Sequence, residues 1–367
     1  MTRVLCILGT RPEVVKFAPV VRALRERRIP VHICSTGQHD RILRDMLNER
    51  EMSVDFQPMW DFQPGLSLDE SASQILGYLG TLLSSVLPSL VLVQGDTTTA
   101  LCGALAAFHH GIPVGHVEAG LRTSTSTNPF PEEMNRRLIS QLATFHFCPT
   151  SRAALNLRME RTAGQIVMTG NPIVDELLHA YERGIAAKKI EYARLVLITC
   201  HRRETLTERL AMLREQVTRF AHANPNTLCL WPLHPNPLIV EYMRRAERPS
   251  NFHVCEPMGH QEFLAALVRA NLVITDSGGV IEEATTLQRP LIIIRDETER
   301  PEALDRRATL LPLAQMQTLT AEMTAMLAPP ITRRLFPRRQ ERIGFDYTFG
   351  NGDAGKQIAK FIHFWLQ

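Results

Sequence analysis

The stretch VLCILGTRPE, residues 4–13, decides the fold class of this chain. Five apolar residues are followed by the turn residues Gly9 and Thr10. Pro12 then suits the first turn of a helix, because the N–H that proline lacks needs no partner there. Residues 12–28 continue with apolar positions at helical spacing. The stretch therefore predicts a buried parallel strand that leads into a helix, the repeating unit of α/β proteins.

The same alternation of short apolar runs and helical segments continues through the chain. In the first half, buried strands are expected at residues 4–8, 31–35, 90–94, 114–117 and 145–148. In the second half they are expected at residues 195–199, 228–232, 252–255, 272–275 and 291–294. Residues 169–172, TGNP, have the composition of a linker. We therefore predict an α/β protein of two doubly wound, Rossmann-like domains, residues 1–171 and 172–353, facing a central cleft.

Composition agrees with a globular protein of two domains and excludes several other classes. A chain of 367 residues exceeds what one hydrophobic core usually serves, and 44% hydrophobic with 22% charged residues is ordinary for globular proteins. The net charge of +3 is too small to indicate a protein that binds nucleic acid. No apolar run approaches about 20 residues, so no membrane span is expected.

The cysteine pattern and the first loop bear on cofactors and location. Seven cysteines are scattered without a C-x-x-C pair, which predicts buried thiols in a reducing compartment, a cytoplasmic location and no metal site. No G-x-G-x-x-G follows the first strand, so no dinucleotide cofactor is expected.

Residues that directly follow a strand carry most weight, because ligands of doubly wound sheets bind beyond the carboxyl ends of the strands. After the first strand, Arg11 and Lys16 could direct two cations at a diphosphate. The alternative for this segment is a surface turn followed by a solvated helix face.

Three carboxylates also follow predicted strands or begin a helix: Asp96, Glu118 and Glu132. Together they could place acid and base groups on both faces of a bound sugar. Two of them have a structural alternative: Asp96 could cap a helix, and a glutamate such as Glu132 in a first turn could favour the dipole and pair with Arg136 or Arg137.

The second half offers a nucleotide site. His201 follows the strand at 195–199 and could donate a hydrogen bond to a phosphate oxygen or assist the leaving group. Ser277, Gly278 and Gly279 lie between a strand and a helix, where exposed N–H groups and the helix dipole favour phosphate. Glu283, one turn into that helix, could accept hydrogen bonds from both ribose hydroxyls.

Ten segments together resemble the non-hydrolysing UDP-N-acetylglucosamine 2-epimerases, and they follow the order of that family along nearly the whole chain. They are GTRPE (9–13) with Lys16, TGQH (36–39), GDTTTA (95–100), GHVEAGLRT (115–123), PFPEEMNRRL (129–138), TGN (169–171), HRRE (201–204), HPNP (234–237), DSGGVIEEA (276–284) and RDETERPEA (295–303). The resemblance implies the type-B glycosyltransferase fold, in which the final helix, residues 354–367, packs back on the first domain.

The resemblance also implies a reaction and its residues. UDP leaves C1 of UDP-N-acetylglucosamine while a base removes the C2 proton, and UDP then adds back to the 2-acetamidoglucal to give UDP-N-acetylmannosamine for a surface polysaccharide. By matched position, the catalytic residues are Asp96, Glu118, Glu132 and His201. The UDP contacts are Arg11, Lys16, Phe263, Ser277, Gly278, Gly279, Glu283 and Arg300. The resemblance implies no cofactor, and because relatives are often dimers, a homodimer is expected.

Departures from the family pattern fall beside this site. Bacterial members bind a second UDP-N-acetylglucosamine as an activator, and the matching positions are Gln38, His39, Arg202 and His234. An activator glutamine is replaced by Arg41 and a basic position by Gly65, so activation is expected to be altered. On the uracil side, Met258 and His260 replace a glutamine and a tyrosine, which predicts different contacts to the base.

Three other functions share the same sequence features. A hydrolysing relative would release N-acetylmannosamine and UDP, and the sequence leaves this alternative open. A type-B glycosyltransferase would have no need of three carboxylates for proton exchange at C2. A nucleotide-sugar sensor would have no need of the four candidate catalytic residues.

Overall fold

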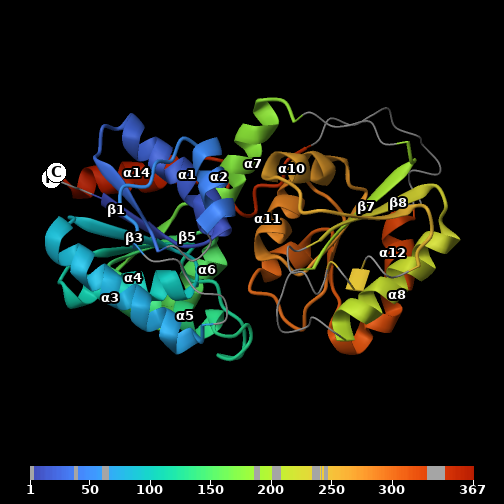
Figure 1. Cartoon of the computed structure of the whole chain (residues 1–367), viewed down its shortest axis with the longest axis horizontal. Coiled ribbons are helices and arrows are strands. Elements are labelled where there is room, and N and C mark those ends of the chain that lie inside the picture. The colour runs from blue at the N-terminus through green and yellow to red at the C-terminus, as the bar shows by residue number, and fades with distance from the viewer. Residues whose placement is uncertain are drawn as a thin grey trace. The chain divides into compact units, whose positions relative to one another are not determined.

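Two compact units make up the chain (Figure 1). The computed structural model describes residues 4–36, 40–59, 66–185, 191–200, 208–233, 240, 242–243, 247–328 and 344–367. Unit 1 comprises Met1–His179 with Phe349–Gln367, and unit 2 comprises Ala180–Thr348. The first division thus lies eight residues after the predicted one at 171, because helix α7 (Pro172–Glu182) begins on unit 1.

A buried carboxylate ties the start of α7 to unit 1. Asp175 accepts hydrogen bonds from the backbone N–H groups of Ala354 and Gly355, at 3.1 and 2.8 Å. These two residues begin the last helix, α14 (Ala354–Trp365), so the carboxylate satisfies N–H groups that a helix leaves without internal partners.

Among the described residues, unit 1 contains a six-stranded parallel sheet in the order β2-β1-β3-β4-β5-β6. Its strands are β1 (Val4–Leu8), β2 (Val31–Ser35), β3 (Leu90–Gln94), β4 (Val114–Val117), β5 (Phe145–Cys148) and β6 (Gln165–Met168). Its helices, besides α7 and α14, are α1 (Arg11–Glu26), α2 (Asp40–Glu49), α3 (Leu68–Val86), α4 (Thr98–His109), α5 (Glu132–Leu142) and α6 (Ser151–Met159).

Alternate residues of β1 point into different cores, because successive side chains of a strand face opposite sides of a sheet. Val4, Cys6 and Leu8 enter a core with α1 and α14, whereas Leu5 and Ile7 enter a core with α3 and α4. Helices therefore cover both faces, as a doubly wound sheet requires.

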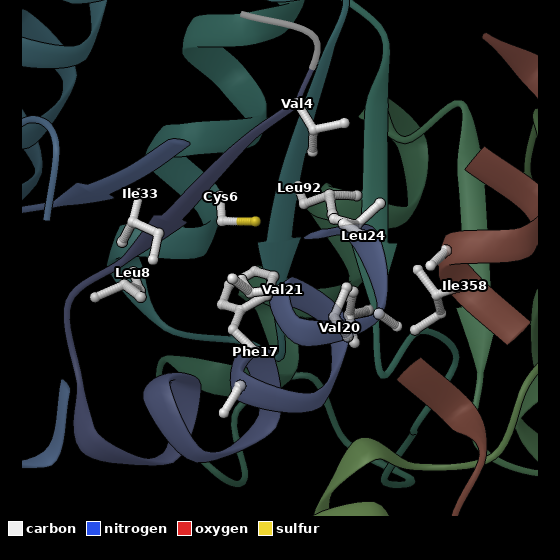
Figure 2. Packing of buried hydrophobic residues seen from close by; sticks show 14 of the residues in the cluster. Val4, Cys6, Leu8, Phe17, Val20, Val21, Leu24, Ile33, Leu92 and Ile358 are labelled. Atoms are coloured by element: carbon white, nitrogen blue, oxygen red, sulfur yellow. The ribbon is translucent and has the colours of Figure 1, made fainter. Parts of the chain in front are cut away.

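The α1 face shows why the last helix belongs to unit 1. Figure 2 shows Ile358 of α14 beside Val20 and Leu24 of α1. A Cβ on Gly355 would lie 2.6 Å from the carbonyl atoms of Pro19, so only glycine allows this close helix contact. Pro19 lies inside α1, which runs as one helix from Arg11 to Glu26.

In the described part of unit 2, a second six-stranded parallel sheet has the order β12-β11-β10-β7-β8-β9. Its strands are β7 (Arg194–Thr199), β8 (Thr227–Pro232), β9 (Phe252–Cys255), β10 (Leu272–Thr275), β11 (Leu291–Ile293) and β12 (Ala308–Leu310). Its helices are α8 (Glu208–Ala223), α10 (His260–Arg269), α11 (Gly278–Thr286) and α12 (Leu319–Leu327), with 3-10 segments at Pro301–Asp305 and Leu313–Thr318.

The prediction of an α/β fold with two doubly wound sheets is confirmed, and all ten predicted strands are present. Two strands were not predicted, β6 and β12, which each lie at one edge of a sheet. Neither contains a buried residue, in contrast to a central strand such as β3, which is buried throughout.

All seven cysteines are free thiols, six of them buried, as the sequence predicts. In the described residues, no helix combines the length and the apolar composition needed to cross a membrane.

Candidate active site

Each sheet has a switch point, a position where neighbouring strands lead into helices on opposite faces and where α/β proteins bind ligands. In unit 1 this point lies between β1 and β3. Glu13, at the start of α1, joins the two loops there. Its carboxylate accepts hydrogen bonds from Gly9 N, Thr10 N and Thr10 Oγ1 at 2.7–2.9 Å, and from Thr97 Oγ1 at 2.7 Å.

The Glu13 carboxylate is fully buried, and burial raises its pKa above the usual range while the four donors oppose that rise. Because Thr97 is the residue directly before α4, this carboxylate holds the loops after β1 and β3 in one arrangement. Arg11 and Asp96 are close in sequence to these anchoring residues.

Glu118 and Lys16 form a buried ion pair immediately after β4. The Nζ of Lys16 lies 2.5 and 2.7 Å from the two carboxylate oxygens of Glu118, and the two side chains are 6% and 4% exposed. The Nε2 of Gln94 donates to the same carboxylate, and so does the Nδ2 of Asn171 at 3.0 Å. Three segments that are far apart in sequence thus place donors around one carboxylate.

The backbone of Glu118 adopts the left-handed conformation, with φ at +67°. This conformation is unfavourable for a residue with a side chain, and such strain clusters at functional sites. The buried ring of His116 supports the neighbouring loop, since its Nε2–H donates to the carbonyl of Gly95 at 2.7 Å. Burial lowers the pKa of His116 to about 3, so this ring is neutral.

Asp96 does not cap a helix, because Thr97 does so: its Oγ1 accepts from Ala100 N at 3.0 Å. Asp96 instead pairs with Arg136 of α5, whose Nη2 lies 3.2 Å from Oδ2. The Nδ2 of Asn135 donates to the Asp96 carbonyl at 2.8 Å. The loop that carries Asp96 is therefore fastened to the first turns of α5.

The two glutamates that begin α5 have different surroundings. Glu133 is fully buried, pairs with Arg136 and Arg137 at 3.2 and 2.8 Å, and accepts from Thr123 N. The first-turn pairing with arginine that was considered for Glu132 is thus made by Glu133. Glu132 is half-buried and is the first residue of α5, one turn before Asn135, which holds the loop of Asp96.

Arg11 is the first residue of α1, and its guanidinium is half-buried. Burial lowers its pKa, and among the described residues no carboxylate pairs with it. A cation in this setting favours an anionic ligand, which would replace the water it has lost.

In unit 2 the switch point lies between β7 and β10. The hydroxyls of Thr199 and Thr275, at the ends of these strands, are 2.6 Å apart. Thr275 Oγ1 also accepts from Ser277 N at 2.9 Å, which sets the turn into α11. Ser277 is the residue before α11, and its side chain makes no capping bond. The first N–H groups of a helix have no internal partners, so this turn can bind phosphate.

Arg300 lies directly against this turn. A Cβ on Gly278 would be 2.5 Å from the Nη1 of Arg300, so any larger residue here would displace the guanidinium from its present position. Arg300 is buried and bonds Glu282 at 2.7 Å and Glu299 at 2.5 Å. Glu299 also bonds Arg295, whose Nε donates to the Asp276 carbonyl. Two arginines and two glutamates thus form a charge-balanced support beneath the turn.

The predicted ribose and uracil contacts lie on α11 and α10. Glu283 is buried, and its Oε1 lies 3.5 Å from the Nε2 of His260. Phe263 is half-buried one turn further along α10. His260, identified above as a departure from the family pattern, is thus next to the predicted ribose-binding carboxylate.

His201, Arg202, Gln38, His39 and His234 lie outside the described residues. Within the described part of the chain, no three His, Cys, Asp or Glu residues form a group that could hold a metal ion.

Comparison with known proteins identifies the family. The sequence model described as UDP-N-acetylglucosamine 2-epimerase matches residues 22–363. The chain belongs to the UDP-N-acetylglucosamine 2-epimerase family. The predictions of this family and of an isomerase are thereby confirmed.

Relatives in this family match over their full length. The chain is 36% identical to a probable UDP-N-acetylglucosamine 2-epimerase of Ralstonia solanacearum, with 99% of each chain covered. It is 36% identical to the UDP-N-acetylglucosamine 2-epimerase of Escherichia coli, with 98% of each covered.

Solved structures of family members have the same fold as this chain. The 2-epimerase of Neisseria meningitidis bound to UDP-GlcNAc has a TM-score of 0.87 and 32% identity, covering 99% of this chain and 100% of that one. A glycosyltransferase of kitacinnamycin has a TM-score of 0.61 at 14% identity, covering 100% and 99%, and shows the shared fold alone.

Sequence reasoning did not assign roles to Glu13, Gln94 and Asn171. Each lies in or beside a segment that marks the family, at the end of a strand or the start of a helix. A polar residue of low exposure at such a position is the signal that could have identified them.

Proposed function

We propose that this member of the family is a non-hydrolysing enzyme that interconverts UDP-N-acetylglucosamine and UDP-N-acetylmannosamine. The observation that carries the proposal is the strained, buried Glu118, which Lys16, Gln94 and Asn171 hold beyond the carboxyl end of β4. Related structures bound to UDP-GlcNAc or to UDP support a UDP-sugar as the substrate.

In the first half of the reaction, a base removes the proton from C2 and the C1–O bond to UDP breaks, giving 2-acetamidoglucal and UDP. In the second half, an oxygen of UDP forms a bond to C1 again while an acid delivers a proton to the other face of C2. The C2 proton is not beside a carbonyl, so it becomes acidic mainly through the positive charge that develops as UDP leaves. Carboxylates around the sugar stabilise that charge.

Unit 1 supplies the groups that act on the sugar in this proposal. Glu118, paired with Lys16, accepts or returns a proton at C2, while Asp96 and Glu132 act on the opposite face of the sugar. The Arg136–Asp96 pair and the Asn135 bond limit the movement of Asp96. Arg11 is the cation that binds the diphosphate as it departs.

Unit 2 supplies the nucleotide contacts. The N–H groups at Ser277, Gly278 and Gly279 bind phosphate, and Arg300 supports the turn from beneath. Glu283 accepts from the ribose hydroxyls, Phe263 lies against the uracil, and His201 assists the leaving group.

The test is to incubate the protein with UDP-N-acetylglucosamine in D₂O and follow the products by NMR. Deuterium at C2 of intact UDP-sugar is expected, together with UDP-N-acetylmannosamine. Release of free N-acetylmannosamine would instead support the hydrolysing alternative. Absence of C2 exchange, with sugar transferred to an added acceptor, would exclude both.

A matched pair of variants locates the chemistry. Glu118→Gln is expected to abolish C2 exchange while UDP still binds, as measured by calorimetry. Glu215→Gln removes the same charge from an exposed position on α8 and should keep full exchange. Full activity of Glu118→Gln would remove this residue from the mechanism.

We also propose a cytoplasmic location and a role in the synthesis of surface polysaccharide precursors. The seven free thiols support a reducing compartment. The homodimer stays a prediction.

A further inference from the structure

A cavity of about 280 Å³ lies in unit 2 at the end of the sheet where β11 and β12 begin, whereas the Ser277 turn lies at the end where the strands finish. It is formed by the starts of β11 and β12, the residues after α11, and Asp346; its lining residues are Thr285, Gln288, Arg289, Leu291, Arg306, Arg307, Ala308 and Asp346. Helix α11 has nine residues, so the Ser277 turn and this cavity are about 13 Å apart along the helix axis.

Positive charge dominates this cavity. Three of its lining residues are arginines, and the one carboxylate, Asp346, is 3.1 Å from Arg306. Asp346 also accepts from Thr348 N at 2.8 Å, so its charge is already shared. Arg307 and Arg289 have no carboxylate partner among the described residues.

The contacts of the Arg289 guanidinium favour an anionic ligand. Its Nη1 donates to the Ala270 carbonyl at 3.4 Å, whereas its buried Nε has no acceptor within the described chain. Burial lowers the pKa of Arg289, the nearby Tyr181 opposes this shift, and the neighbouring Arg307 adds to it. A guanidinium in this state is stabilised by an anion that meets its free N–H and offsets the charge of Arg307.

The end of α11 does not supply a competing negative charge. The last four carbonyls of a helix usually lack partners and attract cations. Here the carbonyls of residues 283–286 accept from the N–H groups of Leu287, Arg289, Gln288 and Asp346, at 2.8–3.0 Å. If the arginines only neutralised the end of the helix, they would contact carbonyls that lack hydrogen-bond partners. The last carbonyls of α11 already accept backbone N–H groups, so this role does not explain the arginines.

We propose that this cavity is a second anion site, which binds a compact phosphate-bearing anion of the size of pyrophosphate. Its volume is near the lower limit of small-ligand sites, about 300 Å³, which suits two phosphate groups better than a whole nucleotide. The forks of Arg289 and Arg307 can each hold phosphate oxygens through paired donors.

The experiment is calorimetric titration of the full-length protein with inorganic pyrophosphate, in the presence of saturating UDP. UDP fills the proposed nucleotide site, so heat from pyrophosphate reports on a different site. Binding is expected, and Arg307→Gln should weaken it about tenfold, the effect of removing one charged hydrogen-bonding partner. Arg289→Gln should weaken it at least as much.

The matched control is Arg219→Gln, which removes one positive charge from an exposed ion pair on α8, outside the cavity. This variant should bind pyrophosphate like the parent. If UDP alone binds twice and Arg307→Gln removes the weaker event, the site accepts nucleotide phosphates and the proposal stands. If the parent binds neither pyrophosphate nor a second UDP, the proposal is overturned. Equal binding by the parent and the double variant Arg289→Gln/Arg307→Gln would also overturn it.

Discussion

The ammonium of Lys16 lies 2.5 Å from a carboxylate oxygen of Glu118, and the pair is buried although 102 residues separate its members. Each charge has lost its water and depends on the other. Removing one member should therefore cost more than removing both.

A double-mutant cycle measures this dependence. Lys16→Met and Glu118→Gln should each lower the free energy of unfolding by about 3–5 kcal/mol, because each leaves an uncompensated buried charge. The combined variant should lose clearly less than the sum of the two single losses. Urea unfolding of the four proteins supplies the values, and simple additivity would show that the two charges are not coupled.

Gly278→Ala tests the support beneath the phosphate turn. The new Cβ would lie within 3 Å of the Arg300 guanidinium, so Arg300 must move and its bonds to Glu282 and Glu299 must lengthen. We expect a loss of about 1–3 kcal/mol in stability and at least tenfold weaker UDP binding by calorimetry. Gly77→Ala, in α3 of unit 1, is the control, since nothing lies within 4 Å of its added Cβ. UDP affinity equal to that of the control would contradict the assignment of this turn.

Glu13 should tolerate one substitution better than another. Glu13→Gln can keep an oxygen toward Gly9 and Thr10 and turn its amide toward the hydroxyl of Thr97, which can accept. Glu13→Ala leaves the buried donors without an acceptor. We expect losses of about 1–2 kcal/mol for the glutamine variant and more than about 3 kcal/mol for the alanine variant in thermal or urea unfolding. Equal losses would mean that charge, not acceptor geometry, holds these loops.

The raised pKa of the buried Asp175 carboxyl predicts that the stability of the protein depends on pH. Burial raises its pKa to about 7 from the ordinary 3.8, despite the two N–H groups that it accepts from. Between these values the folded protein holds a proton that the unfolded chain has released, so the free energy of unfolding falls as pH rises from about 4 to 7. Asp175→Asn removes this fall, and its stability relative to the parent should rise by up to about 4 kcal/mol over that range. Parallel curves of unfolding free energy against pH would contradict the prediction.

The altered activator positions predict simple kinetics. With Arg41 and Gly65 in place of the family residues, initial rates against UDP-N-acetylglucosamine should be hyperbolic. A sigmoidal curve would show that activation by a second substrate molecule is retained.

The sequence predicted the central strands well because burial on both faces leaves a continuous apolar run, as in Leu90–Gln94. Two outer strands, β6 and β12, contain no buried residue and were not predicted, whereas the outer strands β2 and β9 were. The role of Asp96 as a cap was one alternative that local spacing could not exclude, since Thr97 beside it is an equally good cap.

The candidate site was predictable in its residue types and less so in its pairings. Lys16 was expected at a diphosphate, whereas here its ammonium is bound to Glu118. Arg300 was expected at the phosphates, whereas its charge is shared by Glu282 and Glu299. The contact between Lys16 and Glu118, which are 102 residues apart, depends on how strands are ordered in the sheet, and local patterns do not encode that order.

The packing of Ile358 and Ile362 against α1 also bears on synthesis at the ribosome. Unit 1 is built from the beginning and the end of the chain, so its α1 core is complete only after the whole of unit 2 has been made. Until then, apolar side chains such as Val20 and Leu24 lack the helix that covers them. A nascent chain in this state is exposed to association with its neighbours, and chaperone binding to the unfinished first unit is the expected protection.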